Sequence, residues 1–211
     1  MKRLNIVFLD RATFGNDCKI RKPNFPHNWI EYQLTKKSQV FNRVKDADIV
    51  ITNKVILKNE YLKKLKKLKF ISIPSTGTNI IDLMYCKKLG IKVSNIRNYA
   101  NDSVAEHVLG LIIYLTKKIG LVNDDIKKGK WLKRKTFGAF LRTIPILKGK
   151  KIGIIGKGST GKALAKISRG FGMKVTFFSA RKFKEIEFIK FLSCQDILSI
   201  HCPLADNTRN L

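Results

Sequence analysis

The sequence predicts an α/β protein of two domains, each built on a parallel sheet. Short apolar runs alternate with helix-like segments along most of the 211 residues. A polar stretch at 94–102, without apolar periodicity, separates two such series, and a glycine-rich turn follows the apolar run at 150–155. We therefore expect one domain over residues 1–98 and a second over residues 99–211.

The first domain is expected to alternate strands and helices. Apolar runs rich in β-branched residues predict strands at 4–9, 46–51, 70–73 and 91–93. Helices are expected at 59–69, where leucines recur on one face, and at 81–89, which Gly90 ends. Residues 10–28 contain Gly15, Pro23 and Pro26 and are expected to form a loop.

The second domain is expected to open with a long helix. Ser103 to Glu106 has the pattern of a capping box, and apolar residues then recur at helical spacing up to about Lys128. A basic arm over 130–149 carries Trp131. Beyond it, strands are expected at 150–155, 174–178 and 196–201, and helices at 161–171 and 185–192.

The glycine-rich turn has the spacing of a dinucleotide-binding loop. Gly156 allows the tight turn, Gly158 lets the backbone approach a pyrophosphate, and Gly161 lets the helix pack close to the strand. Backbone amides of Ser159 and Thr160 would then face the phosphates at a helix N-terminus. The flanking strand, helix and second strand make this a prediction of a Rossmann-type domain that binds NAD(P).

The end of the next strand indicates which dinucleotide is preferred. An NAD site usually has Asp or Glu there, to bind the ribose 2′-hydroxyl. This sequence has Ser179, Arg181 and Lys182 instead. Two cations and no carboxylate favour a ribose 2′-phosphate, so we expect NADP(H) over NAD(H). The alternative is that Arg181 and Lys182 are ordinary surface charges.

Composition limits the choice of partners. The 43 Lys+Arg against 15 Asp+Glu give a net charge of +28, which suggests nucleic acid. The lysines are spread along the chain and accompany abundant Ile and Asn. This pattern favours a bias toward A- and T-rich codons over a nucleic-acid footprint, and no helix-turn-helix or zinc-finger pattern accompanies it.

Cysteine spacing and hydropathy point to a soluble cytoplasmic protein. The four cysteines are far apart, form no metal-ligand spacing and are expected as reduced thiols. The longest apolar stretch, 108–115, is far shorter than a membrane span, and no signal peptide is visible. No metal site and no Ser-His-Asp or Cys-His arrangement is expected.

Several motifs together resemble one enzyme family. They are Val7 to Thr13, Ile51 to Val55, Ser75 to Asp82, Ser103 to His107, the glycine loop, Phe171 to Val175, His201 to Leu204, and Asn207 to Leu211. In combination they resemble the D-isomer-specific 2-hydroxyacid dehydrogenases, in the branch of glycerate dehydrogenase (hydroxypyruvate reductase). The resemblance covers essentially the whole chain.

The resemblance implies a flavodoxin-like substrate domain followed by a Rossmann domain. It implies hydride transfer between a nicotinamide and a small 2-oxo or 2-hydroxy acid, in a homodimer built on the cofactor domains. Amides of Thr76 and Gly77 match the positions that bind the substrate carboxylate. Further cofactor contacts are implied at Val104, His201, Cys202, Pro203 and Thr208.

The family's Arg, Glu and His of catalysis match no residue of this chain. In the resemblance all three lie beyond residue 211, as does the segment that returns to the first domain. We therefore expect an incomplete Rossmann domain and an inactive fragment of the dehydrogenase. The alternative is a non-catalytic dinucleotide-binding or interaction remnant. Neither reading selects a particular 2-oxo acid.

Overall fold

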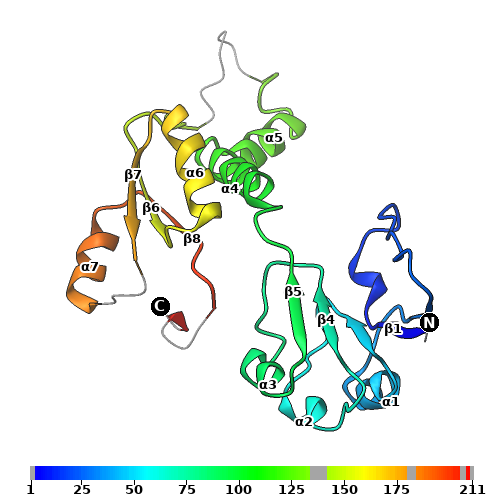
Figure 1. Ribbon diagram of the computed structural model, residues 1–211. Coiled ribbons are helices and arrows are strands. Elements are labelled where there is room, and N and C mark those ends of the chain that lie inside the picture. Colours follow the sequence, from blue (N-terminus) through cyan, green and yellow to red (C-terminus); the bar gives the residue numbers. More distant parts are fainter. Residues whose placement is uncertain (1–2, 134–141, 180–183, 205–207, 210–211) are drawn as a thin grey trace. The chain divides into compact units, whose positions relative to one another are not determined.

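The computed structural model describes residues 3–133, 142–179, 184–204 and 208–209. The chain divides into two compact units, residues 1–97 and 98–211 (Figure 1). Each unit is an α/β layer structure with a parallel sheet. The two units are described separately below.

The first unit has a five-stranded parallel sheet in the order β2-β1-β3-β4-β5. This is the order of flavodoxin-like folds. The strands are β1 (Leu4–Phe8), β2 (His27–Glu31), β3 (Ile49–Ile51), β4 (Phe70–Ile73) and β5 (Lys92–Asn95). Strand β2 was not predicted, and the loop expected over residues 10–28 is wrong at His27 and Asn28, which begin this strand. It is an edge strand that pairs only with β1 in the described sheet and carries no continuous apolar run.

The helices of the first unit are short. They are η1 (Arg11–Thr13), η2 (Lys37–Gln39), α1 (Val40–Val44), α2 (Asn59–Leu62) and α3 (Leu83–Lys88). The helix expected over 59–69 is wrong beyond Leu62, because Lys64, Leu65 and Leu68 donate to carbonyls three residues back, as in turns. Leu65 and Leu68 are nevertheless buried. The leucine pattern therefore predicted the buried side chains correctly, but it predicted too long a helix.

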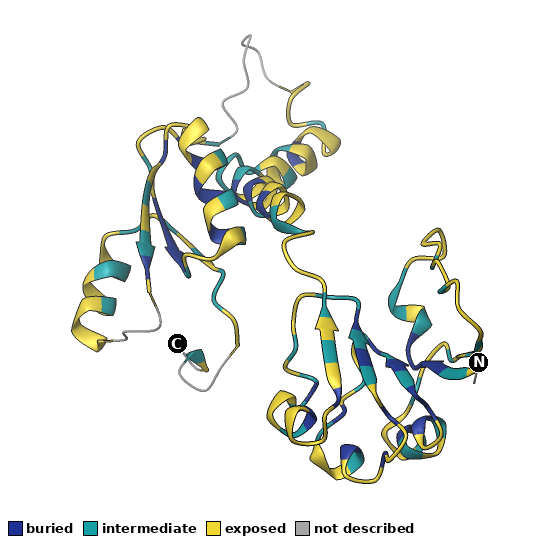
Figure 2. Ribbon diagram, in the orientation of Figure 1, coloured by how far each residue is buried: buried dark blue, intermediate teal, exposed yellow. Residues whose placement is uncertain are grey.

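The core of the first unit lies between these helices and one face of the sheet. Alternate residues of the central strands, Val7, Val50 and Ile71, pack there with residues of α1, α2 and α3. The opposite face carries Ile6 and Phe8 and is covered by parts of segment 14–25, over a cavity of about 370 Å³. Figure 2 shows the buried residues along the strands.

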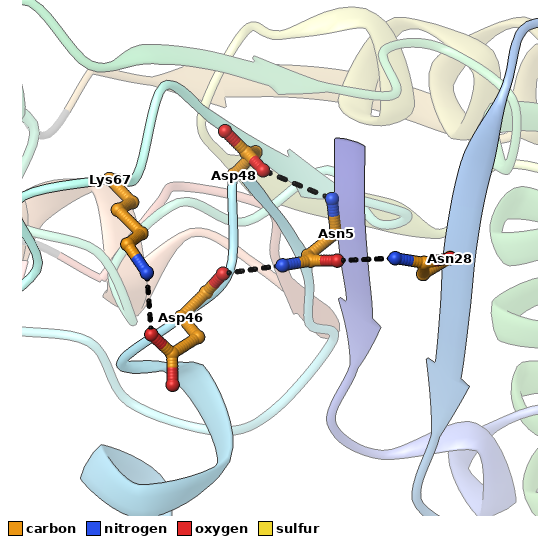
Figure 3. A network of polar contacts seen from close by, with 5 residues as sticks. All are labelled: Asn5, Asn28, Asp46, Asp48 and Lys67. Carbon is orange, nitrogen blue, oxygen red and sulfur yellow. Dashed lines mark hydrogen bonds and ion pairs between the residues drawn. The ribbon is translucent and has the colours of Figure 1, made fainter. Parts of the chain in front are cut away.

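The amino ends of the strands are tied together by polar side chains (Figure 3). The backbone N–H of Asn5 donates to Asp48 Oδ2 at 3.0 Å, and its side-chain amide donates to the Asp46 carbonyl at 3.1 Å. Asn28 donates to Asn5 Oδ1 at 2.9 Å, and Lys67 pairs with Asp46 at 2.7 Å. This network occupies the end of the sheet opposite the one where ligands bind in open α/β folds.

The second unit has a three-stranded parallel sheet in the order β7-β6-β8. Its elements are α4 (Asn101–Thr116), α5 (Ile119–Lys127), β6 (Lys151–Ile155), α6 (Ser159–Gly170), β7 (Lys174–Phe178), α7 (Glu185–Ser193) and β8 (Ile197–Ile200). Helix α4 lies alongside α6 (Figure 1). Ala105 and Ile112 of α4 share a buried cluster with Ile152, Ile154 and Leu164.

The long helix expected from Ser103 to Lys128 is wrong in two respects. It begins at Asn101, and its N-cap, Ala100, has no side-chain hydrogen bond, so the capping box at Ser103 does not form. It is also interrupted after Thr116: Lys118 adopts a left-handed φ of 52°, and α5 starts at Ile119. A left-handed residue cannot continue an α-helix, and the apolar repeat conceals this break because both helices present apolar residues.

The outer parts of the second unit are poorly buried. Helix α7 contributes no fully buried residue, and Leu198 and Ile200 of β8 are 46% and 64% exposed (Figure 2). Strand β8 pairs only with β6 in the described sheet. Among the described helices, none is both long and apolar enough to cross a membrane.

Candidate functional site

The glycine-rich loop leaves the carboxyl end of β6, the central strand of its sheet. The chain passes from β6 to β7, which lies on one side of β6, and then from β7 to β8, which lies on the other side of β6. The strand order therefore reverses at β6. In open α/β sheets such a switch point is where ligands bind, outside the carboxyl ends of the strands.

Gly156 makes the closest approach in this loop. Its φ is +104°, a backbone conformation that residues with a side chain rarely adopt. A Cβ added there would lie 2.7 Å from the backbone nitrogen of Cys202 and 2.8 Å from the carbonyl of His201. The Gly156 amide donates to Phe178 at 2.9 Å, and the His201 amide donates to Ile155 at 2.8 Å. The three strand ends are thus tied at this glycine.

Gly161 packs the following helix against the strand. A Cβ added there would overlap the carbonyl oxygen of Gly156 and approach Ile154 Cγ2 at 3.2 Å. Gly158 differs, because nothing lies within 4 Å of the position of its missing Cβ. The loop is therefore tight against the protein at Gly156 and Gly161 and open at Gly158, as a backbone cradle for a bulky anion requires.

The loop presents a run of unpaired amides. Within the described residues, the backbone amides from Lys157 to Gly161 donate to no acceptor, and the first helical bond runs from Lys162 to Gly158 at 2.9 Å. Helix α6 has no capping side chain and no acidic residue in its first turn. Free amides and the positive end of the helix dipole are the features that helix N-termini use to bind anions.

Ser159 and Thr160, which the sequence predicts as phosphate contacts, belong to this first turn. Ser159 is exposed and Thr160 is half-buried. The Thr160 hydroxyl donates to Asn101 Oδ1 at 3.0 Å, so its side chain turns toward the start of α4. Val104, also on α4, is 38% exposed.

Only one of the residues predicted to read the ribose can be placed. Ser179 directly follows β7 and is exposed. Arg181 and Lys182 lie outside the described residues. The end of β7 thus lies where the sequence predicts it, and the roles of Ser179, Arg181 and Lys182 stay predictions.

The segment after β8 reaches the glycine loop through its backbone. His201 and Cys202 are half-buried beside Gly156, and Cys202 packs on Ile155 and Phe178. The His201 Nε2 atom shares a hydrogen bond with Ser199 Oγ at 2.9 Å. Burial lowers the pKa of the His201 imidazole below its usual range, which favours the neutral ring at neutral pH.

Pro203 and Thr208 lie beyond this segment and are joined by one hydrogen bond. The Thr208 hydroxyl donates to the Pro203 carbonyl at 2.7 Å. Pro203 is exposed and Thr208 half-buried. The Thr208 side chain, implied by resemblance as a cofactor contact, therefore also has a structural partner.

A second loop with unpaired amides follows β4 in the first unit. Four carbonyl oxygens of this loop accept hydrogen bonds. The Thr76 carbonyl accepts from Asn95 Nδ2 at 2.8 Å, and the Asn79 carbonyl accepts from Lys58 Nζ at 2.7 Å. The carbonyls of Ser75 and Thr78 accept from backbone amides. Within the described residues, no amide from Ser75 to Asn79 has an acceptor. Thr76 and Gly77 are exposed. This arrangement leaves donors for a carboxylate.

Asp10 fixes the neighbouring loop after β3. It is 2% exposed, and its carboxylate accepts hydrogen bonds from the backbone amides of Asn53, Lys54 and Val55 at 2.6–3.1 Å, and from the Thr52 hydroxyl. A buried carboxylate with several donors is a strong local constraint. The loop that follows β3, within the motif of residues 51–55, is therefore held in place by Asp10.

Three contributing residues were missed by the sequence interpretation. Asn95 and Lys58 hold the loop after β4, and Asn101 holds Thr160. Asn101 lies four residues before the buried Ala105 and so on the same helix face. That spacing would have identified it, had the helix been started at 101. Among the described residues, no three His, Cys, Asp or Glu side chains gather in a way that could hold a metal ion.

The two sheet orders and the glycine loop define a two-unit α/β protein with a Rossmann-like second unit. Comparison with known proteins agrees. The sequence model of the D-isomer specific 2-hydroxyacid dehydrogenase catalytic domain matches residues 16–196. A glycerate dehydrogenase of Methylorubrum extorquens is 37% identical over 98% of this chain and 66% of its own length.

Two solved structures share the fold. An NAD+-bound 3-phosphoglycerate dehydrogenase of Entamoeba histolytica superposes with a TM-score of 0.69 at 24% identity, over 98% of this chain and 65% of that one. An acyclic imino acid reductase in complex with NADPH and D-Arg gives 0.76 at 23% identity, over 97% and 67%. The chain spans about two thirds of the length of these proteins.

The chain therefore belongs to the D-isomer specific 2-hydroxyacid dehydrogenase family. The resemblance of the sequence motifs to this family is confirmed, as is the predicted fold class.

Proposed function

We propose that the protein is a nicotinamide-dinucleotide-dependent oxidoreductase of the D-2-hydroxyacid dehydrogenase type. In this proposal the second unit binds NAD(P) and the first unit binds a small 2-oxo or 2-hydroxy acid. The bound nicotinamide would supply hydride transfer to or from the substrate carbon. Family membership and the sheet orders support this assignment of the two units.

The observation that carries the proposal is the run of free amides from Lys157 to Gly161 at the switch point of the second sheet. A pyrophosphate fits this cradle for three reasons. The space beside Gly158 is open, α6 has no acid in its first turn, and the amides need acceptors. Val104, His201, Cys202, Pro203 and Thr208 are proposed as further contacts by resemblance.

The substrate class follows from the loop after β4. Amides of Thr76 and Gly77 are proposed to bind the substrate carboxylate, because both residues are exposed and no described acceptor takes their amides. The similarity to a glycerate dehydrogenase favours hydroxypyruvate, glycerate or glyoxylate as the acid.

We further propose a preference for NADP(H), based on Ser179, Arg181 and Lys182 and the absence of a carboxylate at the end of β7. Double substitution of Arg181 and Lys182 by alanine tests this. We expect the Kd for NADPH to rise about tenfold or more, because the substitutions remove the two cations that would bind its 2′-phosphate. The Kd for NADH should change little, because NADH has no 2′-phosphate. Equal changes for both cofactors would refute the preference.

For the 211-residue chain by itself, we propose dinucleotide binding without efficient turnover. By resemblance, its residues include neither the Arg that holds the substrate nor the Glu and His of acid–base catalysis. General acid–base catalysis commonly contributes about 10²–10⁴-fold to rate. The second candidate, a non-catalytic dinucleotide-binding or interaction remnant, shares the binding site but excludes turnover in any form of the protein.

A homodimer through the second unit is also proposed. Apolar side chains of α4 and α5 are exposed in the single chain: Leu111, Tyr114, Leu115, Ile119, Leu121 and Ile126. An apolar surface of this kind is typical of an interface. Sedimentation velocity measures the assembly directly, and a monomer at tens of micromolar protein would contradict the proposal.

Two measurements test the proposed function. Binding of NADPH and NADH is measured by the change in nicotinamide fluorescence, and oxidation of NADPH is measured in the presence of hydroxypyruvate or glyoxylate. Saturable binding supports the proposal. Absence of binding of both dinucleotides would refute it, and turnover by this chain would exclude the non-catalytic remnant.

A further inference from the structure

The Thr160 side chain is held by a residue outside the glycine loop. Its hydroxyl donates to Asn101 Oδ1 at 3.0 Å, although the two residues are 59 positions apart in sequence. Both residues are half-buried. The bond joins the first turn of α6, which carries the unpaired amides, to the first turn of α4.

Asn101 and Thr160 each lie in the first turn of a helix, on the face that is buried one turn later. Asn101 lies four residues before Ala105, which is 1% exposed, and Thr160 lies four residues before Leu164, which is 0% exposed. Residues four apart share a helix face. Since α4 lies alongside α6 (Figure 1) and Ala105 and Leu164 share one buried cluster, the hydrogen bond is the polar end of an apolar helix contact.

The bond determines what the Thr160 hydroxyl can do. A hydroxyl has one proton to donate, and in Thr160 that proton goes to Asn101 Oδ1, so it is not available to a second acceptor while this bond holds. The anion site therefore consists of backbone amides, whose directions depend on how the first turn of α6 is oriented. Helix α6 has no capping side chain of its own at this end, so Asn101 provides an external constraint on this turn.

We propose that Asn101 is a positioning residue of the dinucleotide site. It acts through Thr160 and keeps the amides of residues 157–161 aimed at the pyrophosphate, without touching the cofactor itself. This inference rests on the proposed function, because it requires that the loop binds a dinucleotide.

A double-mutant cycle on binding tests the inference. The variants are Asn101→Ala, Thr160→Val and the double variant, and the readout is the Kd for NADPH and NADH. Each single variant is expected to weaken binding about tenfold, because loss of either partner releases the turn. The double variant is expected to bind no more weakly than either single variant, because both remove the same bond.

Thr116→Val is the matched control. It makes the same substitution and removes a hydroxyl hydrogen bond of α4, from Thr116 to the Ile112 carbonyl at 2.6 Å, away from the glycine loop. It is expected to leave dinucleotide affinity unchanged. Urea unfolding of every variant accompanies the titrations, and Thr160→Val, which keeps the side-chain volume, serves if Asn101→Ala does not fold.

The outcomes separate the inference from the proposed function. Non-additive losses in variants that remain folded support the positioning role. Wild-type affinity in the folded single variants, or losses that add in the double variant, overturn it while leaving the proposed function intact. Absence of dinucleotide binding by the wild-type chain refutes the proposed function and this inference with it.

Discussion

The loop after β6 and the loop after β4 both present consecutive backbone amides beyond the end of a parallel strand, but they are held in different ways. Gly156 and Gly161 fix the first loop through direct backbone packing, and α6 continues from it. Side chains of Asn95 and Lys58 fix the second loop by binding its carbonyls. The first should thus tolerate almost no change at Gly156 and Gly161, whereas the second should respond gradually to the loss of each side-chain hydrogen bond.

The strongest test of this difference is the substitution Gly156→Ala. The added Cβ would meet backbone atoms of His201 and Cys202 at 2.7–2.8 Å, and φ is +104°. Strain and displacement together should cost about 3 kcal/mol, or roughly a 100-fold loss of dinucleotide affinity. Titration with NADPH measures this.

Gly110→Ala is the control for that substitution. Gly110 lies within α4, and nothing lies within 4 Å of its missing Cβ. Alanine there should leave affinity unchanged and stabilise the helix by up to about 1 kcal/mol. Equal affinities of the Gly156 and Gly110 variants would contradict the packing account of the loop.

An acidic residue in the first turn of α6 should separate binding from stability. Ser159→Asp places a negative charge where the helix dipole favours one, and should raise the free energy of unfolding by about 0.5 kcal/mol. The same charge repels a pyrophosphate, so NADPH affinity should fall about tenfold. Urea unfolding and titration measure the two effects. A parallel rise in stability and affinity would exclude the first turn as the phosphate site.

In the loop after β4, Asn95→Ala should have a moderate effect. It removes the donor to the Thr76 carbonyl and should lower the free energy of unfolding of the first unit by about 1 kcal/mol. Urea unfolding followed by tryptophan fluorescence in a Trp131→Phe background, where Trp29 is the remaining tryptophan, measures this. Ser94→Ala, at an exposed position of the same strand, is the control. A fall of about 3 kcal/mol or more in this free energy, as large as the cost expected for Gly156→Ala, would remove the distinction between the two loops.

The smallest expected effect concerns pH and His201. Burial lowers the pKa of this imidazole in the folded protein. Below pH of about 6.5, the unfolded chain therefore takes up a proton that the folded chain resists, so stability falls as pH decreases and is unaffected above that range. Urea unfolding at pH 7.5 and 5.5 should show this loss in wild type and a smaller one in His201→Gln. An identical pH dependence in both would show that His201 makes no contribution.

The sequence predicted two strands and the position of the glycine loop better than the helices around them. Strands β4 and β7 were predicted with their observed limits, because β-branched and aromatic residues are concentrated in these two short runs. The glycine loop was placed correctly between β6 and α6, because Gly-x-Gly-x-x-Gly marks both a strand end and a helix start. These signals are local in sequence.

What the sequence did not reveal depends on contacts between distant segments. The break at Lys118 and the start of α4 at Asn101 are set by packing and by φ, neither of which changes the apolar repeat. The hydrogen bond of Asn101 to Thr160 and that of Asn95 to Thr76 join separate elements, so no motif encodes them. The edge strand β2 lacked a continuous apolar run for a related reason: much of it is exposed.

The most direct test of the central claim is amide hydrogen exchange with and without saturating NADPH. We expect slower exchange at residues 157–161, whose amides have no acceptor among the described residues, and unchanged exchange at residues 75–79, which are proposed to bind the substrate. Protection confined to other segments, or no protection at 157–161 under saturating conditions, would contradict the assignment of the glycine loop as the dinucleotide site.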